Sequence, residues 1–465
     1  MTANARRPRP PRSPPPFTPS NAMKRILSSL LAVVALGSVL RADPTPDQPV
    51  PDQLDLKTAI RFAVENNFQI REARERIRQQ TGVLIQVRAG DLPTLVASGD
   101  YQINQKKISQ VTPPSNDFWQ VSLVATENVY AGGGVEAGIR NASLGKDAAV
   151  LDLKSVINAA LLDVRTKFYT VLLDREKVSV QEQNIKLLES QLKDASNRFE
   201  AGSASAFEKL QAQVSLANGQ VPLISARNDL RIAIDQLRQS LGFTTTSREA
   251  TRKVPEFIGN LDNEPASFEI QSALDSARAN RPEIQRYQKL VDAGVKGVTV
   301  ARSSYYPTVD LTAGWQAEKN PYPQLIHGSS VNGFSAAVKG SWSIFDGGNT
   351  RGKVVQAKSL LEQARLTLGE QTLAIDVEVR QAYSSWQEAV ELTDATKQTV
   401  GQAEESLRLA TARYNAGSAT HLDVLQAETD LTLARTNLVQ ANFSYAVAVA
   451  TLREAMGVTD VLFAE

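Results

Sequence analysis

The fold is decided by the stretch Arg198-Phe199-Glu200-Ala201-Gly202-Ser203-Ala204-Ser205, which recurs 215 residues later as Arg413-Tyr414-Asn415-Ala416-Gly417-Ser418-Ala419-Thr420. In each copy a long helical pattern runs into a glycine, the residue that most readily takes the left-handed conformation after a helix. A serine or threonine then stands where the N-cap of a following helix is expected. Each copy therefore predicts the tip of an antiparallel helical hairpin, at residues 200–205 and 415–420.

Two acids follow these tips at the spacing of a capping box. Glu208 and Asp423 lie three residues after Ser205 and Thr420. Helix capping, worth about 0.5 to 2 kcal/mol, is one explanation of both acids. Capping combined with a ring of acids that faces a lumen is the alternative. His421, beside Asp423, is predicted to be a solvated residue of the first helical turn.

The duplication extends over almost the whole chain. At an offset of 214 the positions before the predicted strands match, and after one inserted residue the offset becomes 215. Matched pairs include Pro93 with Pro307, Gly132 with Gly347, and Leu241 with Met456. The sequence thus predicts a first repeat at residues 43–242, a linker at 243–267, a second repeat at 268–457 and a tail at 458–465.

The N-terminal region differs from the rest in composition. Residues 1–22 are rich in Pro and Arg without apolar periodicity, which predicts a disordered extension. Met23-Lys24-Arg25 then leads into an apolar run from Ile26 to Leu40, which has the length of a signal-peptide core. Residues 23–42 are therefore predicted to be a signal peptide. No later segment reaches the roughly 18 consecutive apolar residues of a membrane helix.

Charge and residue usage narrow the function. The 465 residues carry 51 Lys+Arg and 50 Asp+Glu, a net charge of +1, so the chain lacks the basic balance of nucleic-acid binders and we expect no nucleic acid partner. There is no Cys and there are two His, which excludes thiol chemistry and argues against a transition-metal site. No nucleophile-base set or phosphate loop is visible, so we expect no cofactor, no metal and no enzymatic activity.

Each repeat has the predicted order helix, β-hairpin, long helix, tip and shorter helix. The hairpins are placed at residues 95–130 and 309–345, and the long helices at 136–199 and 350–414. The shorter helices follow at 206–241 and 421–456. Pro222 is predicted to kink or interrupt the first of these.

The four predicted strands alternate apolar and polar residues, as Leu95, Ala97 and Tyr101 do with their neighbours. Strands of about ten residues with this pattern fit a transmembrane β-barrel with lipid outside and water inside. Trp119, Trp315 and Trp342 are placed as membrane-interface aromatics. A soluble antiparallel sheet packed on a core is the alternative.

The long helices demand a partner along their length. At 1.5 Å per residue, the first is about 95 Å long. In the helix that follows it, leucines recur every seven residues from Leu216 to Leu237 with small residues between them. Such a heptad favours close, left-handed supercoiled packing. The wall of a tube and an antiparallel coiled coil without a lumen both fit this pattern.

The duplicated order, together with Tyr414-x-x-Gly417 followed by Leu422-Asp423-Val424-Leu425-x-Ala427, resembles the TolC family of outer membrane efflux proteins over residues 54–457. The resemblance implies a mainly α fold with a β-barrel portion. Duplicated long helical hairpins would form a periplasmic α-barrel, and four strands per chain would contribute to a trimeric 12-stranded outer membrane β-barrel. Strand sharing agrees with physics, because an open sheet edge is not stable in lipid.

The resemblance also implies a function and partners. The chain would be the passive exit duct of a tripartite efflux pump in the outer membrane of a Gram-negative bacterium, with a large periplasmic portion. Its expected partners are two further copies in a homotrimer, a periplasmic adaptor protein, an inner membrane transporter of RND, ABC or MFS type, and outer membrane lipid. Two other functions stay open: the exit channel of a type I protein secretion system, and a non-conducting periplasmic coiled-coil scaffold.

Specific residues follow from the same resemblance. The adaptor would dock on the tips, at Gly202, Ser203, Ala204, Gly417, Ser418 and Ala419. The periplasmic entrance and gate would include Glu208, Tyr414 and Asp423. Ala419 stands where the best-known member has a gating Arg, and Gln426 where it has a second acid, so a tyrosine-arginine latch is not carried over to this chain.

Overall fold

The computed structural model of the chain describes residues 53–103, 117–243, 255–261, 265–319 and 330–458. The predicted extension at 1–22, the predicted signal peptide at 23–42, most of the linker and nearly all of the tail lie outside the described residues. Among the helices that are described, none has both the length and the apolarity needed to cross a bilayer.

The first repeat begins with α2 (Leu56–Asn66), α3 (Phe68–Arg88) and a short 3₁₀ turn, η1 (Ala89–Asp91). Strands β2 (Thr94–Ile103) and β3 (Asp117–Ala131) follow, then the long helix α4 (Gly134–Glu200) and helix α5 (Ala206–Leu241). α5 continues through Pro222, so the predicted interruption is wrong. One missing backbone hydrogen bond is tolerated there because α5 packs along α4.

The second repeat has the same order. It contains α6 (Ile270–Asn280), α7 (Pro282–Ser303), β5 (Thr308–Lys319), β6 (Ser330–Ser341), α8 (Asn349–Asn415) and α9 (His421–Ala455). Two short strands, β1 (Gln53–Leu54) and β4 (Glu256–Phe257), pair in parallel and connect the start of the first repeat to the linker.

The second hairpin is shorter than the sequence predicts. The alternation predicts a hairpin at residues 309–345, but β6 ends at Ser341. The Trp342 indole N–H donates to the Tyr305 carbonyl at 3.1 Å. Just after it, the Asp346 carboxylate accepts from the backbone N–H of Gly348 and of Thr350. β6 ends at Ser341 because the residues after it form these other hydrogen bonds, in which Asp346 caps the start of α8.

The first predicted helix of each repeat is in fact two helices. In the first repeat, the Asn67 side chain accepts from the backbone N–H of Gln69 and donates to the Ser240 carbonyl at 2.7 Å, which starts α3 and ties it to the end of α5. In the second repeat the break falls at Arg281, because a residue before proline is pushed out of the helical conformation.

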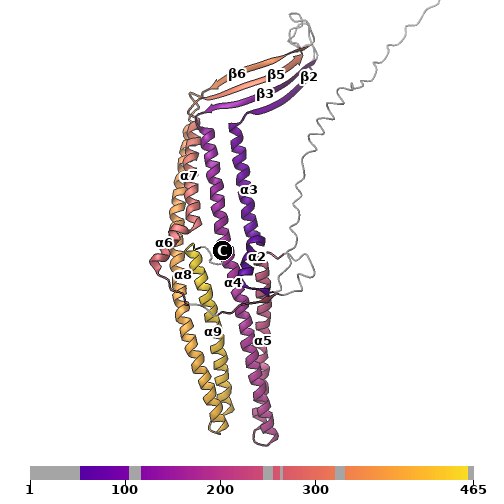
Figure 1. Cartoon of the computed structure of the whole chain (residues 1–465), viewed down its shortest axis with the longest axis vertical. Coiled ribbons are helices and arrows are strands. Elements are labelled where there is room, and N and C mark those ends of the chain that lie inside the picture. Colours follow the sequence, from indigo (N-terminus) through magenta and orange to yellow (C-terminus); the bar gives the residue numbers. More distant parts are fainter. Residues whose placement is uncertain (1–52, 104–116, 244–254, 262–264, 320–329, 459–465) are drawn as a thin grey trace, which may run out of the picture. The chain divides into compact units, whose positions relative to one another are not determined.

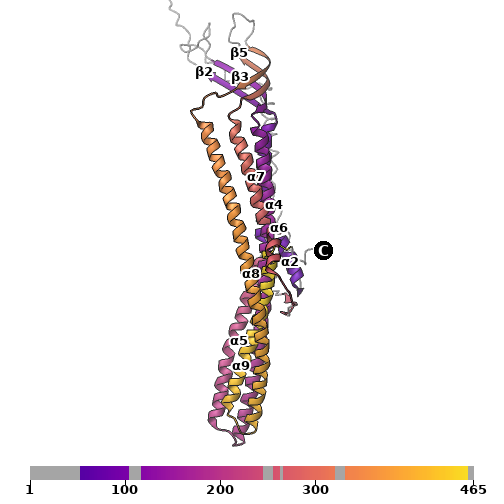
Figure 2. The same cartoon turned by 90° about the vertical axis from the view of Figure 1, so that its left-hand side faces the viewer.

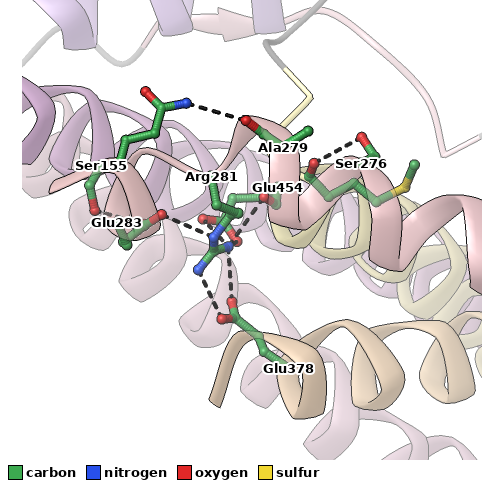
Figure 3. Close-up of polar contacts among 9 residues, drawn as sticks. Ser155, Ser276, Ala279, Arg281, Glu283, Glu378 and Glu454 are labelled. Atoms are coloured by element: carbon green, nitrogen blue, oxygen red, sulfur yellow. Dashed lines mark hydrogen bonds and ion pairs between the residues drawn. The ribbon is translucent and has the colours of Figure 1, made fainter. Parts of the chain in front are cut away.

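Arg281 joins four helices at this second break. Its buried guanidinium pairs with Glu283 of α7 at 3.0 Å, Glu378 of α8 at 2.9 Å and Glu454 of α9 at 3.2 Å (Figure 3). Ser155 of α4 donates to Glu283 at 2.7 Å. Burial raises the pKa of the Glu454 carboxyl, and the charge of Arg281 opposes that shift.

The four longer strands form one antiparallel sheet in the order β2-β3-β5-β6. Its central pair, β3 and β5, joins the two repeats, while β2 and β6 are its edges (Figure 1). Tyr101 faces Trp119, Leu123 faces Trp315, and Trp315 faces Phe334. Directly paired residues share a face, so most of the large apolar residues of the four strands lie on one side of the sheet, although Val96 and Val124 pair on the other side.

The helices are unequally surrounded. α4 packs against α3 and α7 near the sheet and against α5 and α9 near the tips (Figures 1 and 2). α8, its counterpart in the second repeat, packs against α6, α7 and α9. Two core clusters occupy equivalent places, one containing Val164 and Leu237 and the other Val379 and Leu452. Among the described helices of one chain, α8 has no counterpart of the contacts that α4 makes with a second pair of helices.

Candidate functional site

The two tips have nearly the same backbone. Gly202 and Gly417 have φ of +74° and +76°, which only glycine adopts without strain. Behind them the backbone N–H of Ser203 donates to the Arg198 carbonyl at 2.8 Å, and that of Ser418 to the Arg413 carbonyl at 2.9 Å. These bonds close the helix C-termini, so both tips turn in the same way.

The six predicted docking residues are accessible at these tips. Gly202, Ser203, Gly417 and Ser418 are exposed, and Ala204 and Ala419 are half-buried. Nothing in the described part of the chain covers them, and glycine, serine and alanine present a nearly flat backbone surface.

Capping differs between the tips. The Ser205 hydroxyl accepts from the backbone N–H of Glu208 at 3.2 Å. At the second tip Thr420 and Asp423 form the reciprocal capping box, with the Thr420 N–H donating to Asp423 at 2.7 Å. These bonds lower the pKa of the exposed Asp423 carboxyl, so Asp423 is anionic and points to solvent while it caps α9. Capping and an acid at the channel entrance are therefore compatible.

Tyr414 lies in a cluster built from both tips. The Arg198 guanidinium stacks over the Tyr414 ring at 4.7 Å and donates to the Asn415 side chain at 3.3 Å. The His421 ring is 5.6 Å from the Tyr414 ring, and Glu208 is close enough to His421 to affect its charge. Sequence reasoning missed Arg198 as a partner of Tyr414, although it stands in the repeated stretch itself.

The prediction that His421 is solvated is wrong. The residue is buried, with 7% of its surface exposed. It begins α9 where that helix packs on α4, beside Tyr414. Burial lowers the pKa of its imidazole, and Arg198 lowers it further while Glu208 opposes the shift. The Nε2 atom is buried without a hydrogen-bond partner.

A second buried ionisable group escaped sequence reasoning. Glu428 is 3% exposed and accepts a hydrogen bond from the Gln191 side chain of α4. Burial raises the pKa of Glu428 to about 7. The signal in the sequence was its heptad position, because it lies seven residues after His421 and between the buried Val424 and Leu431.

Two of the predicted interface aromatics lie in the sheet. Trp119 pairs with Tyr101, and Trp315 pairs with Phe334. These two pairs occupy equivalent positions of the two repeats, and the ladder of β3 with β5 sets Trp315 opposite Leu123, four residues from Trp119. Trp342 follows the end of β6 near the helices. Aromatic residues flanking an apolar band are typical of strands that span a bilayer, and for these three residues the interface role stays a prediction.

Among the residues that the structure describes, no group of three or more His, Cys, Asp or Glu is arranged to hold a metal ion.

Comparison with known proteins agrees with this geometry. Residues 59–243 and 273–458 match the family described as outer membrane efflux protein, one match for each repeat. The chain is similar to the outer membrane efflux protein BepC of Brucella suis, with 24% identity covering 95% of this chain and 92% of that one. It is also similar to the alkaline protease secretion protein AprF of Pseudomonas aeruginosa, with 25% identity covering 64% and 62%.

The fold is shared with solved structures. The crystal structure of the Campylobacter jejuni CmeC outer membrane channel superposes with a TM-score of 0.75 at 16% identity, covering 86% of this chain and 85% of that one. The chain belongs to the outer membrane efflux protein family, in agreement with the predicted resemblance. It is an outer membrane efflux channel protein with a large periplasmic helical portion, and members of its family are channels that work with adaptors and inner membrane transporters.

Proposed function

We propose that three copies of this chain form one continuous exit duct for small molecules, closed near the tips and docked there by a periplasmic adaptor, and that the duct acts without catalysis. The observation that carries the proposal is the unequal surrounding of α4 and α8. The contacts of α4 with α7 and α9, and of β3 with β5, have equivalents between α8 and the helices α3 and α5 and between β6 and β2 that are not made among the described residues of one chain. A second copy would supply them.

The helices support this assembly. Val439 of α9 packs against the first core cluster, whereas its equivalent in α5, Ile224, is 67% exposed. On α8, the free side carries large exposed apolar residues, among them Leu366, Leu373 and Val377. Packing α8 of one copy against α3 and α5 of the next would bury both sets. At about 25 cal/mol per Å² of apolar area, such burial favours association.

The strands lead to the same arrangement. β3 pairs with β5 inside the chain, so β6 would pair with β2 of the next copy. Inside the chain, Leu123 of β3 pairs with Trp315 of β5. The repeat equivalent of Leu123 is Val338 in β6, and that of Trp315 is Tyr101 in β2. Val338 would therefore pair with Tyr101 of the partner subunit. Three copies then close a 12-stranded barrel without edges, and a barrel larger than about eight strands leaves an open interior.

The tips support docking and gating. Two tips per chain present the same exposed glycine-serine surface, which suits a repeating adaptor contact. Glu208, Tyr414 and Asp423 would lie at the entrance, where the exposed Asp423 carboxylate would favour cations. The Arg198–Tyr414 stack takes the place of the tyrosine-arginine latch that Ala419 removes.

Conductance of the purified protein in planar bilayers tests the proposed duct. We expect discrete cation-preferring channels, and Asp423→Asn should weaken the cation preference without removing the channels. A protein that stays silent under conditions that open related channels would favour the non-conducting scaffold.

A second candidate is the exit channel of a type I protein secretion system, which the similarity to AprF favours. Deleting the gene and measuring both drug susceptibility and secreted proteins separates the two. Raised susceptibility supports efflux, whereas loss of a secreted protein with unchanged susceptibility supports secretion.

A further inference from the structure

The contact of α4 with α9 beside the second tip contains a buried acid that the proposed duct does not use. We call this contact, from Gln191 and Glu428 to Arg198 and His421, the seam. Glu428 lies in the apolar stripe of α9, and the Gln191 amide of α4 donates to its Oε1. The Gln191–Glu428 hydrogen bond thus connects the helical hairpin of the first repeat (α4 and α5) to that of the second (α8 and α9).

Two oxygens at this bridge lack a donor. Glu428 Oε2 and Gln191 Oε1 are both buried and without a hydrogen-bond partner. An ionised carboxylate and an amide oxygen only accept, so neither can satisfy the other. A single proton on Glu428 changes this, because the carboxylic acid donates to the Gln191 carbonyl while it accepts from the Gln191 amide. The neutral acid is the state in which both side chains are satisfied.

The surroundings supply no compensating charge. The cavity of about 560 Å³ beside Glu428 is lined from α4, α5 and α9, and Glu428 is the only ionisable residue in that lining. Its polar lining is neutral, as with Asn184, Asn218 and Thr432. No charged group contributes to the pKa shift of Glu428, whose causes are burial and the Gln191 hydrogen bond. Ionisable groups elsewhere along the seam include His421, Arg198 and Glu208, and α4 carries Lys193 and Asp194 between Gln191 and Arg198. Arg435 is held by Glu404 of α8 at 2.9 Å and by Gln183 of α4 at 3.2 Å. Burial accordingly raises the pKa of Glu428 to about 7.

The other repeat lacks this acid. The equivalents of Gln191 and Glu428 are Ser406 on α8 and Gln213 on α5, neither of which ionises. In the proposed trimer those residues meet between subunits. The proton-sensitive pair is therefore present only at the contact of α4 with α9 inside each chain. The equivalent contact between chains would not change with pH through these two positions.

We propose that the Gln191–Glu428 pair is a proton-controlled catch that holds α9 on α4 while Glu428 is neutral and releases α9 when Glu428 gives its proton to water. The proton-controlled contact of α9 with α4 is a property of each chain by itself. Any effect of that contact on the passage of molecules through the periplasmic entrance rests on the proposed duct. Released Glu428 regains an ordinary, lower pKa, so the released state binds fewer protons than the closed one. Release is therefore favoured as pH rises towards about 7, and the preference is complete above it.

Hydrogen exchange of the full-length, detergent-extracted protein tests the catch. Between pH 5.5 and 8.5, the exchange of residues 421–436, corrected for the intrinsic rate, should rise by about one to two orders of magnitude. Glu428→Gln, which cannot ionise and still pairs with Gln191, should show no such rise. Asp430→Asn removes an exposed acid of the same helix and should keep the wild-type response. A response that is flat in the wild type, or that persists in Glu428→Gln, overturns the proposal.

Infrared spectroscopy gives a readout that does not depend on the folding of a variant. The wild type should show the carbonyl stretch of a protonated, buried carboxyl at pH 5.5 that disappears near pH 7 to 8. Absence of that band at pH 5.5 contradicts a neutral Glu428. The duct fails separately: a seam that titrates in a protein without conductance overturns the duct and keeps the catch, whereas channels with a flat seam overturn the catch alone.

Discussion

The seam and the positions equivalent to it in the duplicated chain differ in chemistry, although the two tips share a backbone. The seam inside the chain carries Tyr414, His421 and Glu428, while its equivalent positions in the first repeat carry Phe199, Ala206 and Gln213. Both tips keep the positive-φ glycine and a hydroxyl cap, because these hold the helices in place. Duplication has preserved the residues that shape the backbone and has let those at the seam diverge.

The joints near the middle of each repeat show the same division. Asn67 connects α3 to the end of α5 with a neutral side chain, and Arg281 makes the equivalent connection to α9 with a buried charge and three glutamates. The same break between two helices is thus stabilised by a neutral side chain, Asn67, in the first repeat and by a charged one, Arg281, in the second.

The largest effect is expected from proline at the tips. Gly202→Pro or Gly417→Pro should abolish efflux, because proline fixes φ near −65° and cannot take the positive φ of either glycine. The proposed trimer should remain in the membrane, since the tips and the strands lie at opposite ends of the long helices. Drug susceptibility together with unboiled gels checks this, and mutants with unchanged susceptibility would contradict docking at the tips.

The two joints should differ in how much they contribute to stability. Arg281→Ala leaves three half-buried carboxylates without their buried cation and should cost about 2 to 4 kcal/mol, less than a fully buried pair. Asn67→Ala removes hydrogen bonds but no charge and should cost about 1 to 3 kcal/mol. Denaturant unfolding in detergent, followed by circular dichroism, compares them. Equal losses would mean that the charge of the second joint is incidental.

The two caps should differ less. Thr420→Ala breaks a reciprocal capping box and should cost about 1 to 2 kcal/mol, whereas Ser205→Ala breaks a single bond and should cost about 0.5 to 1 kcal/mol. Hydrogen exchange in the first turns of α9 and α5 measures each loss locally. Greater fraying at α5 than at α9 would reverse the expected order.

The smallest effect concerns His421. Because its pKa is lowered by burial, the released state of α9 binds more protons, and release is favoured as pH falls below 6.5. His421→Ala, which copies the residue at the equivalent position of α5, should remove this acid response and leave the response at neutral pH unchanged. Exchange of residues 421–436 between pH 5 and 6.5, compared on the Glu428→Gln background so that the opposite response of Glu428 is absent, shows whether the response is lost. A retained response would exclude His421 as its source.

Sequence reasoning reached the elements whose signals are local and repeated. Glycine followed by a hydroxyl residue located both tips, and period-two alternation located the strands. It missed what depends on packing between distant segments. Nothing near His421 indicates that α4 covers it, and Glu428 and Gln191 are 237 residues apart. The prediction that Pro222 interrupts its helix is wrong because packing against α4 keeps α5 helical where local propensity alone would break it.

The central claim is that a second copy supplies to α8 and β6 the contacts that the first repeat makes inside the chain. The chain has no native Cys, so disulfide cross-linking of Val338→Cys with Tyr101→Cys tests it on a clean background. Paired strand residues lie within disulfide reach, whereas the control pair Phe334→Cys with Tyr101→Cys is displaced by four residues, about 13 Å. We predict a covalent trimer on a non-reducing gel for the first pair and monomer for the control. Monomer from both pairs in membrane-extracted protein would contradict the account.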